Sequence, residues 1–206
     1  MSVTPKAAGR HHHGALRRAL LDAVAEVVLE AGPEAVTLRE CARRAGVSHS
    51  AATPHFGDKR GLLTAFATEG SERLRAAMQA AVAALPPTAD AQTRLAATGR
   101  GYIAFARANP GHFRLLFRAD LLDPDEPAFR AAKEAAFVPL AHAMAALAPG
   151  APARAMRARL ALAWSAVHGF CTLRAELPGA ILWQSDALAE EVAEDLLALV
   201  AEACAG

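Results

Sequence analysis

The sequence contains few of the residues that build disulfide-linked or metal-binding proteins. It has three cysteines and one tyrosine among 206 residues, and aromatic residues make up 5% of the chain. Cys41, Cys171 and Cys204 lie far apart and form no metal-ligand spacing. We therefore interpret each cysteine as a small buried apolar residue, and we predict neither a metal site nor a cofactor.

Long apolar runs are missing as well. No run approaches the ~20 residues needed to span a bilayer, and the polar N-terminal stretch lacks the apolar segment of a signal peptide. This predicts a soluble cytoplasmic protein that makes no contact with a membrane. The zinc-protease motif, the phosphate-binding glycine loop and the nucleophile-elbow motif are also absent, so we do not expect an enzyme.

The residues that are abundant favour helices. Hydrophobic residues make up 53% of the chain, and they recur at helical rather than alternating spacing. We therefore predict an all-α fold of about nine helices. The net charge is only +1. Residues 1–80 carry 11 Lys/Arg against 8 Asp/Glu, whereas residues 81–206 carry 11 against 13, so the weak basic bias lies in the N-terminal part.

Local signals mark where the helices begin and end. Hydroxyl or carboxylate side chains are suited to cap an N-terminus, and Gly or Pro ends several apolar patterns. The helices are predicted at about 15–31, 37–44, a short segment after 48, 58–86, 91–108, a short segment at 113–117, 128–147, 152–177 and from 185 onward, with N-caps at Thr37, Ser48, Asp58 and Ser185. The acidic stretch 120–127 is predicted to be a loop, and Pro139 should kink or break its helix.

The stretch from 41 to 63 contains two short helices around a tight turn, the arrangement of a helix-turn-helix. Ala42 is small where the helices must touch, Gly46 tolerates the turn, and Val47 fills the core behind it. The second helix would offer hydroxyl, imidazole and methyl groups to base edges, and groups around it would bind phosphates. The predicted DNA contacts are Thr37, Ser48, His49, Ser50, Ala51, Thr53, His55 and Lys59. An ordinary helical hairpin with a polar outer face is the alternative.

Two properties of this second helix affect how well it could bind DNA and discriminate between base sequences. None of its exposed residues is Arg or Asn, whose side chains can form two hydrogen bonds to one base. Direct base discrimination should therefore be modest. Pro54 removes one amide hydrogen bond and biases Thr53 away from the helical region. Because Pro54 lies near the end of a helix of about two turns, we expect the motif to survive with a weaker final turn.

Residues 14–66 carry a linked set of features that a hairpin alone would not need. They are Gly32, Thr37-Leu38, Ala42, Ala45-Gly46-Val47-Ser48, His55-Phe56, Asp58-Lys59 and Leu62-Leu63. The segment resembles the N-terminal DNA-binding domain of the TetR family of transcriptional regulators. The resemblance implies that the short helix enters the major groove of double-stranded operator DNA, and that His55 and Lys59 bind phosphates. The family usually has an aromatic residue where Thr53 stands, and often a basic or polar residue in place of Pro54.

The resemblance also implies how the chain is divided. We expect a flexible arm at 1–13, a helix-turn-helix domain at 14–60, and a ligand-sensing and dimerisation domain at 61–206. The stretch His12-His13-Gly14 resembles a family variant that leads into the first helix, which favours native residues over a cloning tag. Lys6 and Arg10 would then lie near the DNA backbone; solvated residues without a role are the alternative.

The second half contains the segment AWSAVHGF at 163–170, preceded by GYIAFARANPGHFRLLF at 101–117. Both resemble a ligand-sensing subgroup of TetR-family C-terminal domains with a Trp-x-x-x-His-Gly signature. Trp164 and His168 are four residues apart and share one helix face, and Gly169 permits close helix approach. The predicted pocket for a small, largely apolar effector is lined by Phe113, Phe117, Phe137, Met144, Trp164 and His168. The alternative is that Trp164 and His168 only fill the core.

The last two helices are expected to pair two copies of the chain, as the resemblance implies. A homodimer could read two half-sites roughly 34–36 Å apart, which a single short helix cannot do. The family's usual outcome is a repressor that a small molecule releases from its operator. A helical protein–protein adaptor without DNA binding is the main alternative, but it would not need Thr37, Gly46, Ser48, His55 and Lys59 in register.

Overall fold

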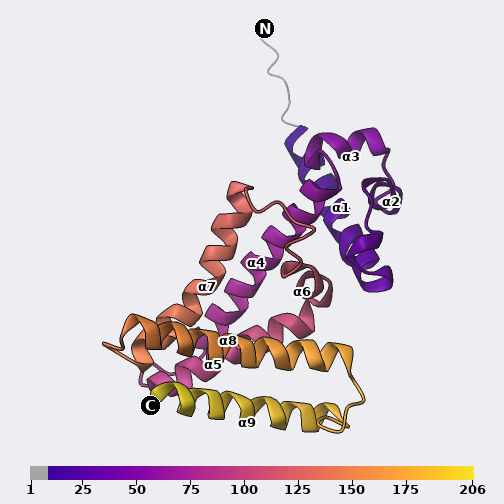
Figure 1. Cartoon of the computed structure of the whole chain (residues 1–206). Helices are drawn as coiled ribbons and strands as arrows, with labels where there is room; N and C mark the ends of the chain where they lie inside the picture. Colours follow the sequence, from indigo (N-terminus) through magenta and orange to yellow (C-terminus); the bar gives the residue numbers. More distant parts are fainter. Residues whose placement is uncertain (1–8) are drawn as a thin grey trace. The chain divides into compact units, whose positions relative to one another are not determined.

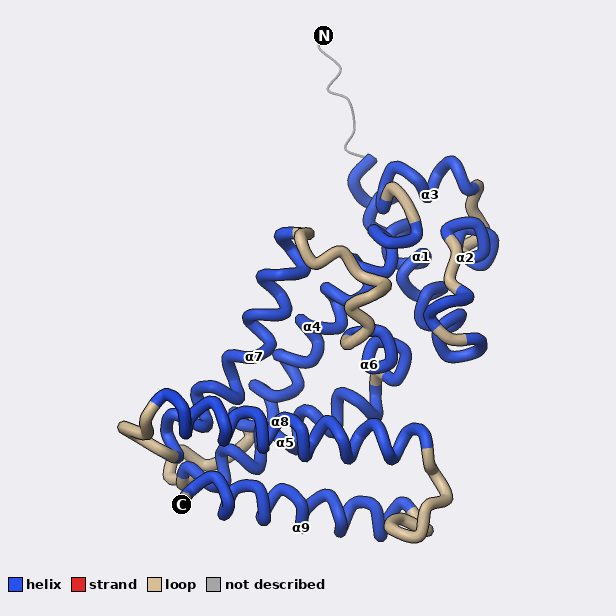
Figure 2. The backbone as a smooth tube through the Cα atoms, viewed as in Figure 1, coloured by secondary structure: helices blue, strands red, loops and turns tan. Residues whose placement is uncertain are grey.

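The computed structural model describes residues 9–206, with side chains from Gly14 onward. Within that range the chain forms nine α helices and one short 3₁₀ helix, η1, and no strand (Figures 1 and 2). The predicted all-α fold of about nine helices is confirmed. Across the same range, no helix combines the length and the apolar character needed to cross a membrane.

The helix bounds follow the sequence signals closely. The elements are α1 (Gly9–Ala31), η1 (Pro33–Ala35), α2 (Leu38–Arg44), α3 (His49–Phe56), α4 (Lys59–Ala83), α5 (Ala91–Ala108), α6 (Pro110–Leu116), α7 (Pro127–Leu147), α8 (Ala153–Glu176) and α9 (Asp186–Ala205). α1 begins six residues before the predicted start at Ala15. The part of the expected arm at 1–8, with Lys6, lies outside the described residues, and so do the side chains of Arg10, His12 and His13.

All four predicted N-caps are confirmed, because each side chain accepts a backbone N–H three residues later. Thr37 Oγ1 accepts from the Glu40 N–H at 3.1 Å, and Ser48 Oγ accepts from the Ala51 N–H at 3.2 Å. Asp58 Oδ1 accepts from the Gly61 N–H at 2.9 Å, and Ser185 Oγ accepts from the Leu188 N–H at 3.2 Å. Each bond satisfies one of the amides that a helix N-terminus leaves without an intrahelical partner.

Pro139 lies inside α7 without interrupting it. Of the two predicted outcomes, a kink or a break, the break is wrong and the kink stays a prediction. The ring removes one backbone hydrogen bond. However, Ala136, Ala143 and Met144 on the same helix remain buried. Burial of this face holds the helix together across the proline, which the local sequence does not reveal.

The chain forms two compact units. Unit 1 combines the described part of Met1–Gly70 with Pro110–Ala131, and unit 2 combines Ser71–Asn109 with Ala132–Gly206. α4 and α7 therefore contribute residues to both units. The boundary proposed from the sequence near residue 60 stays a prediction.

The core of unit 1 lies between α1 and the elements that it contacts, which are η1, α2, α3 and α6. The buried side chains are Leu20, Leu21, Val24, Val27, Val28, Val36, Cys41, Ala42, Ala52, Leu62, Leu63 and Phe66. Burial of one such Leu or Phe side chain contributes roughly 1.5–3 kcal/mol. The buried side of α1 therefore gives α2 and α3 a common support.

Unit 2 is built on α5, α8 and α9, which pack against one another. A Cβ at Gly99 would collide with Leu197 of α9, and a Cβ at Gly101 would lie 2.5 Å from the Cα of Met78 in α4. Small residues of α5 thus allow two neighbouring helices to approach closely. A core cluster joins Ala143 and Met144 of α7 with side chains of α5, α8 and α9.

The three cysteines are buried, as predicted. Burial raises the pKa of the Cys41 thiol to about 11 and that of the Cys171 thiol to about 12. A thiol with so high a pKa is a poor nucleophile and a poor metal ligand, which agrees with a packing role for these residues.

Candidate nucleic-acid interface

A tight turn joins α2 to α3. Gly46 has a φ of +70°, which glycine adopts without strain. The Val47 N–H donates to the Ala42 carbonyl at 3.0 Å, and Ala42 is 1% exposed at the place where the two helices meet. The predicted helix-turn-helix is therefore present, with its small contact residue and its glycine in the expected positions.

α3 turns a polar face to solvent. Ser48, His49, Ser50 and Thr53 are exposed, Ala51 is half-buried and Ala52 is fully buried. Since Ala52 anchors the helix, the hydroxyl and imidazole groups on the other side remain available for a groove of DNA. The first requirement for a reading helix, an outward face of hydrogen-bonding groups, is met.

Pro54 does not end α3, which continues through His55 to Phe56. The Gly57 N–H donates to the Thr53 carbonyl at 2.8 Å and closes the last turn. The bond from residue 54 to the Ser50 carbonyl is missing, because proline has no N–H. The Thr53 hydroxyl donates to the His49 carbonyl at 3.1 Å, so toward a base it can act only as an acceptor.

Three of the predicted DNA contacts lie outside the exposed face of α3 and differ in their surroundings. Thr37 is exposed at the start of α2, whereas His55 is half-buried at the end of α3. Lys59 Nζ donates to the Glu34 carbonyl of η1 at 2.6 Å. An ammonium group has three N–H donors, so Lys59 keeps two of them for a phosphate while η1 holds the side chain in place.

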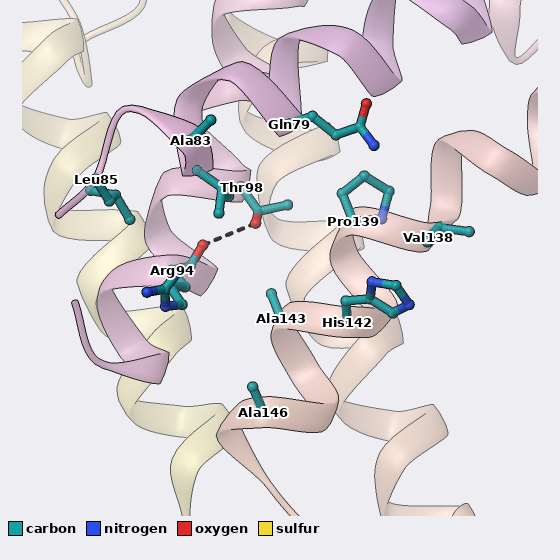
Figure 3. A pocket seen from close by; sticks show the side chains of 11 residues that line it. Gln79, Ala83, Leu85, Arg94, Thr98, Val138, Pro139, His142, Ala143 and Ala146 are labelled. Carbon is teal, nitrogen blue, oxygen red and sulfur yellow. Dashed lines mark hydrogen bonds between the residues drawn. The ribbon is translucent and has the colours of Figure 1, made fainter. Parts of the chain in front are cut away.

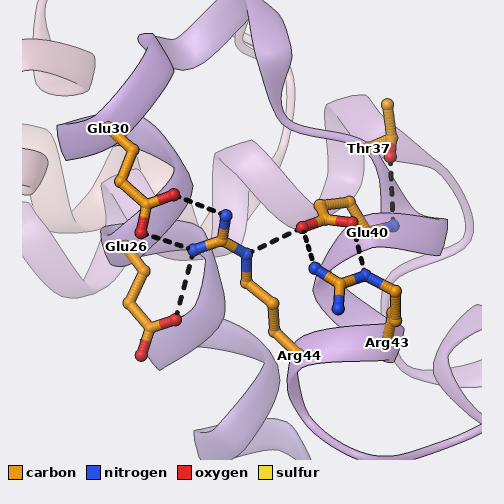
Figure 4. Close-up of polar contacts among 6 residues, drawn as sticks. All are labelled: Glu26, Glu30, Thr37, Glu40, Arg43 and Arg44. Carbon is orange, nitrogen blue, oxygen red and sulfur yellow. Dashed lines mark hydrogen bonds and ion pairs between the residues drawn. The ribbon is translucent and has the colours of Figure 1, made fainter.

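An ion-pair network that the sequence analysis missed fixes α2 to α1 (Figure 4). Arg44 donates to Glu30 at 2.6 and 2.9 Å, approaches Glu26 at 3.4 Å, and donates to Glu40 at 2.9 Å. Hydrogen bonds from Arg43 and Arg44 lower the pKa of Glu40 to about 2. Because α3 follows α2 after only four residues, this network also helps to set the direction of α3.

The six predicted effector residues divide between the two units. Phe113 and Phe117 belong to unit 1, where their rings meet edge to face at 5.9 Å. In unit 2, Phe137 and Trp164 are about 40% exposed, with ring centroids 6.2 Å apart, and Met144 is fully buried. The placement does not test whether these six residues bind a ligand, and that role stays a prediction.

His168 has a polar partner that the sequence analysis did not identify. Its Nδ1 lies 2.8 Å from the Tyr102 hydroxyl, a hydrogen bond between α8 and α5. Burial lowers the pKa of His168 and raises that of Tyr102, so both groups are neutral at pH 7. Tyr102 is the one tyrosine of the chain, and no local pattern pairs it with a residue 66 positions away.

Comparison with known proteins agrees with this geometry. The profile of the family described as "Bacterial regulatory proteins, tetR family" matches residues 20–66, which span α1 to the start of α4. The profile described as "Tetracyclin repressor-like, C-terminal domain" matches residues 95–198, half of the chain. The chain belongs to the TetR family. Its N-terminal part is thus the DNA-binding domain of a TetR-family transcriptional regulator.

Individual TetR-family and related proteins support the assignment. The transcriptional regulator BetI of Escherichia coli K12 is 37% identical over 86 residues, a match that covers 42% of this chain and only 44% of BetI. A protein of unknown function from Rhodococcus sp. RHA1 is 31% identical, with a TM-score of 0.70 over 92% of this chain and 97% of that chain. The TetR-family regulator PfmR of Thermus thermophilus shares the fold, with a TM-score of 0.64 and 21% identity over 89% and 97% of the two chains.

Proposed function

We propose that this chain represses transcription by binding double-stranded operator DNA as a homodimer, and that a small molecule releases it. The observation that carries the proposal is the capped helix α3, anchored by Ala52 with its hydrogen-bonding side chains outward. Such a helix fits the major groove, where base edges present donors, acceptors and the thymine methyl group. An operator-bound regulator acts in the cytoplasm, as the sequence predicts.

The DNA contacts are proposed residue by residue. Ser50, His49 and the methyl of Ala51 would face base edges, and Thr53 would accept a hydrogen bond. Thr37, Ser48, His55 and Lys59 would meet phosphates, which position a protein on DNA without reading its sequence. A protein–protein adaptor remains the alternative function, but membership of the TetR family favours the regulator.

Fluorescence anisotropy with the DNA beside the protein's own gene tests the proposal. Affinity should fall steeply between ~50 and ~200 mM salt, because bound phosphates release counterions. Ser50→Asp should weaken binding at least about tenfold, since a carboxylate would enter the groove beside the phosphates. Ala175→Asp, which places the same charge on an exposed face of α8 away from the proposed dimer surface, should bind as the wild type does. Equal binding by both variants would rule out α3 as the reading element.

The dimer is proposed to form through α8 and α9. Leu162 and Leu173 of α8 are about 45% exposed and share one helix face with Gly169, and Leu199 of α9 is 63% exposed. A Cβ at Gly169 would meet no atom within 4 Å, so a helix of a second copy has room to approach there. These apolar side chains are the kind of surface that a partner subunit covers.

Light scattering after size-exclusion chromatography tests the dimer. The wild type should have twice the mass of the chain, and Leu173→Glu should reduce it to that of one chain by placing a charge in the interface. Ala175→Glu, an exposed position on a different face of α8, should remain dimeric. A dimeric Leu173→Glu variant would move the interface away from α8.

We also propose that the C-terminal domain belongs to the subgroup marked by Trp164, His168 and Gly169. The support is the signature itself and the Tyr102–His168 hydrogen bond, which gives the signature histidine a role in joining α5 to α8. An effector bound in this domain would act by favouring one arrangement of the two subunits. It can shift that equilibrium only as far as its affinities for the two arrangements differ.

A further inference from the structure

A groove of about 540 Å³ opens in unit 2 between the end of α4, the start of α5 and the second half of α7 (Figure 3). This volume lies within the range of small-molecule sites. The space exists because its walls carry short side chains, among them Ala83 of α4 and Ala143 and Ala146 of α7. None of the six effector residues predicted from the sequence lines this groove.

The groove offers hydrogen-bonding groups at a few positions only. Gln79 and His142 stand exposed at its edges. The Thr98 hydroxyl donates to the Arg94 carbonyl at 2.9 Å, as Figure 3 shows, and keeps its lone pairs as acceptors. Pro139 has no N–H to donate to the carbonyl four residues earlier in α7. A mostly apolar wall with a few polar groups is the usual make-up of a ligand site.

The charges around the groove favour a neutral ligand. Among the eleven described residues that line it, none is acidic and Arg94 alone is permanently charged. The Arg94 guanidinium donates to the carbonyls of Pro87 and Ala89 at 2.8 and 3.1 Å. It is therefore engaged in holding the loop between α4 and α5. A cation would find no carboxylate here, and an anion would compete with those two carbonyls.

The wall of the groove is continuous with the core that positions α8 and α9. Ala143 lines the groove and also belongs to the cluster that contains Ala163 of α8 and Val200 and Cys204 of α9. Because a close-packed core transmits small displacements, a molecule pressing on α7 at Ala143 would act on the helices that carry the proposed dimer surface.

We propose that this groove binds an uncharged, largely apolar small molecule with one or two hydrogen-bonding groups, and that it is an effector site of the regulator. The inference rests on the proposed ligand response of the chain. Binding in the groove can nevertheless be measured without DNA. The ligand site and the proposed regulator function can therefore be refuted separately.

Titration of the full chain with the neutral fluorescent probe N-phenyl-1-naphthylamine tests the groove. The wild type should show saturable binding with one site per chain. Ala146→Trp and Ala83→Trp fill the groove from two different helices, and each should weaken binding at least tenfold. Ala145→Trp and Ala80→Trp are the matched controls, because both positions are exposed on the same helices but lie outside the groove; they should bind as the wild type does.

Two results overturn the inference: no saturable binding by the wild type, or equal binding by the filled and control variants. Circular dichroism melting of all four variants separates a filled groove from a damaged fold, and agreement between the α4 and α7 variants supports the groove. Operator binding by the same samples, without probe, tests the proposed function independently. Loss of DNA binding with intact probe binding would refute the regulator and leave the groove standing.

Discussion

Replacing Gly46 by alanine would measure the free-energy cost of a positive φ in the turn that orients α3. Gly46 has a φ of +70°, and a Cβ built there meets no atom within 4 Å. The substitution therefore adds strain without a clash. A left-handed L-residue costs roughly 1–2 kcal/mol, and the less flexible unfolded chain returns about 0.4–1 kcal/mol. We expect a net destabilisation of about 1 kcal/mol.

Hydrogen exchange measured by mass spectrometry is the suitable assay. Both tryptophans, Trp164 and Trp183, lie in unit 2, so tryptophan fluorescence would not report on the turn. Peptides covering α2 and α3 should exchange about fivefold faster in Gly46→Ala, since 1.4 kcal/mol corresponds to a factor of ten in an opening equilibrium. Peptides of α8 and α9 should not change.

Gly46→Asn is the control, because asparagine tolerates the left-handed region better than alanine. It should lie between the wild type and Gly46→Ala. A loss above about 3 kcal/mol would show that the turn contains a contact missing from the structure. Slower exchange in Gly46→Ala would mean that the residue does not have a positive φ, and the account of the turn would be wrong.

Three further outcomes follow from single side chains. Pro54→Arg restores the missing amide donor and adds a cation, so operator affinity should rise and the slope of log affinity against log salt should steepen by about one; an unchanged slope would contradict this. Glu40, whose pKa is lowered from 4.5 to about 2 chiefly by Arg43, contributes stability that is fully present above pH 4.5 and is lost as the pH falls through 2. Glu40→Gln should flatten acid unfolding followed by circular dichroism in that window. Gly101→Ala places a Cβ 2.5 Å from the backbone of Met78, so it should lower the urea midpoint more than Gly46→Ala does.

The local signals in the sequence predicted the helices well because each depends on neighbouring residues. A cap such as Thr37 or Ser185 needs only the amide three residues later, and the turn at Gly46 needs only its own backbone freedom. The break considered at Pro139 does not occur, because burial of α7, a tertiary effect, outweighs one missing hydrogen bond. The start of α1 was placed too late, since polar residues give no apolar pattern there.

The candidate sites also divide into features that follow from the local sequence and features that only tertiary contacts create. The exposed polar face of α3 follows from its own spacing, and membership of the TetR family agrees with it. The Arg44 network joins residues 14 to 18 positions apart, and Tyr102 meets His168 across 66 positions. The groove beside Ala143 exists because the alanines that line it have short side chains. A sequence pattern marks large or charged side chains, so it cannot point to a space left by small ones.

The chemistry of α3 also indicates how the proposed regulator would achieve specificity. Ser48 and Ser50 share a hydrogen bond at 3.0 Å, and the Thr53 hydroxyl hydrogen is already donated to His49, so few donors remain for base edges. Each good bidentate contact discriminates by about 1–3 kcal/mol, and α3 has no side chain that forms one. Most of the discrimination must then come from DNA shape and from the distance between two copies of α3, while phosphate contacts hold the protein in register. An effector that changes this distance through α8 and α9 would therefore act on one of the main sources of the protein's discrimination between DNA sites.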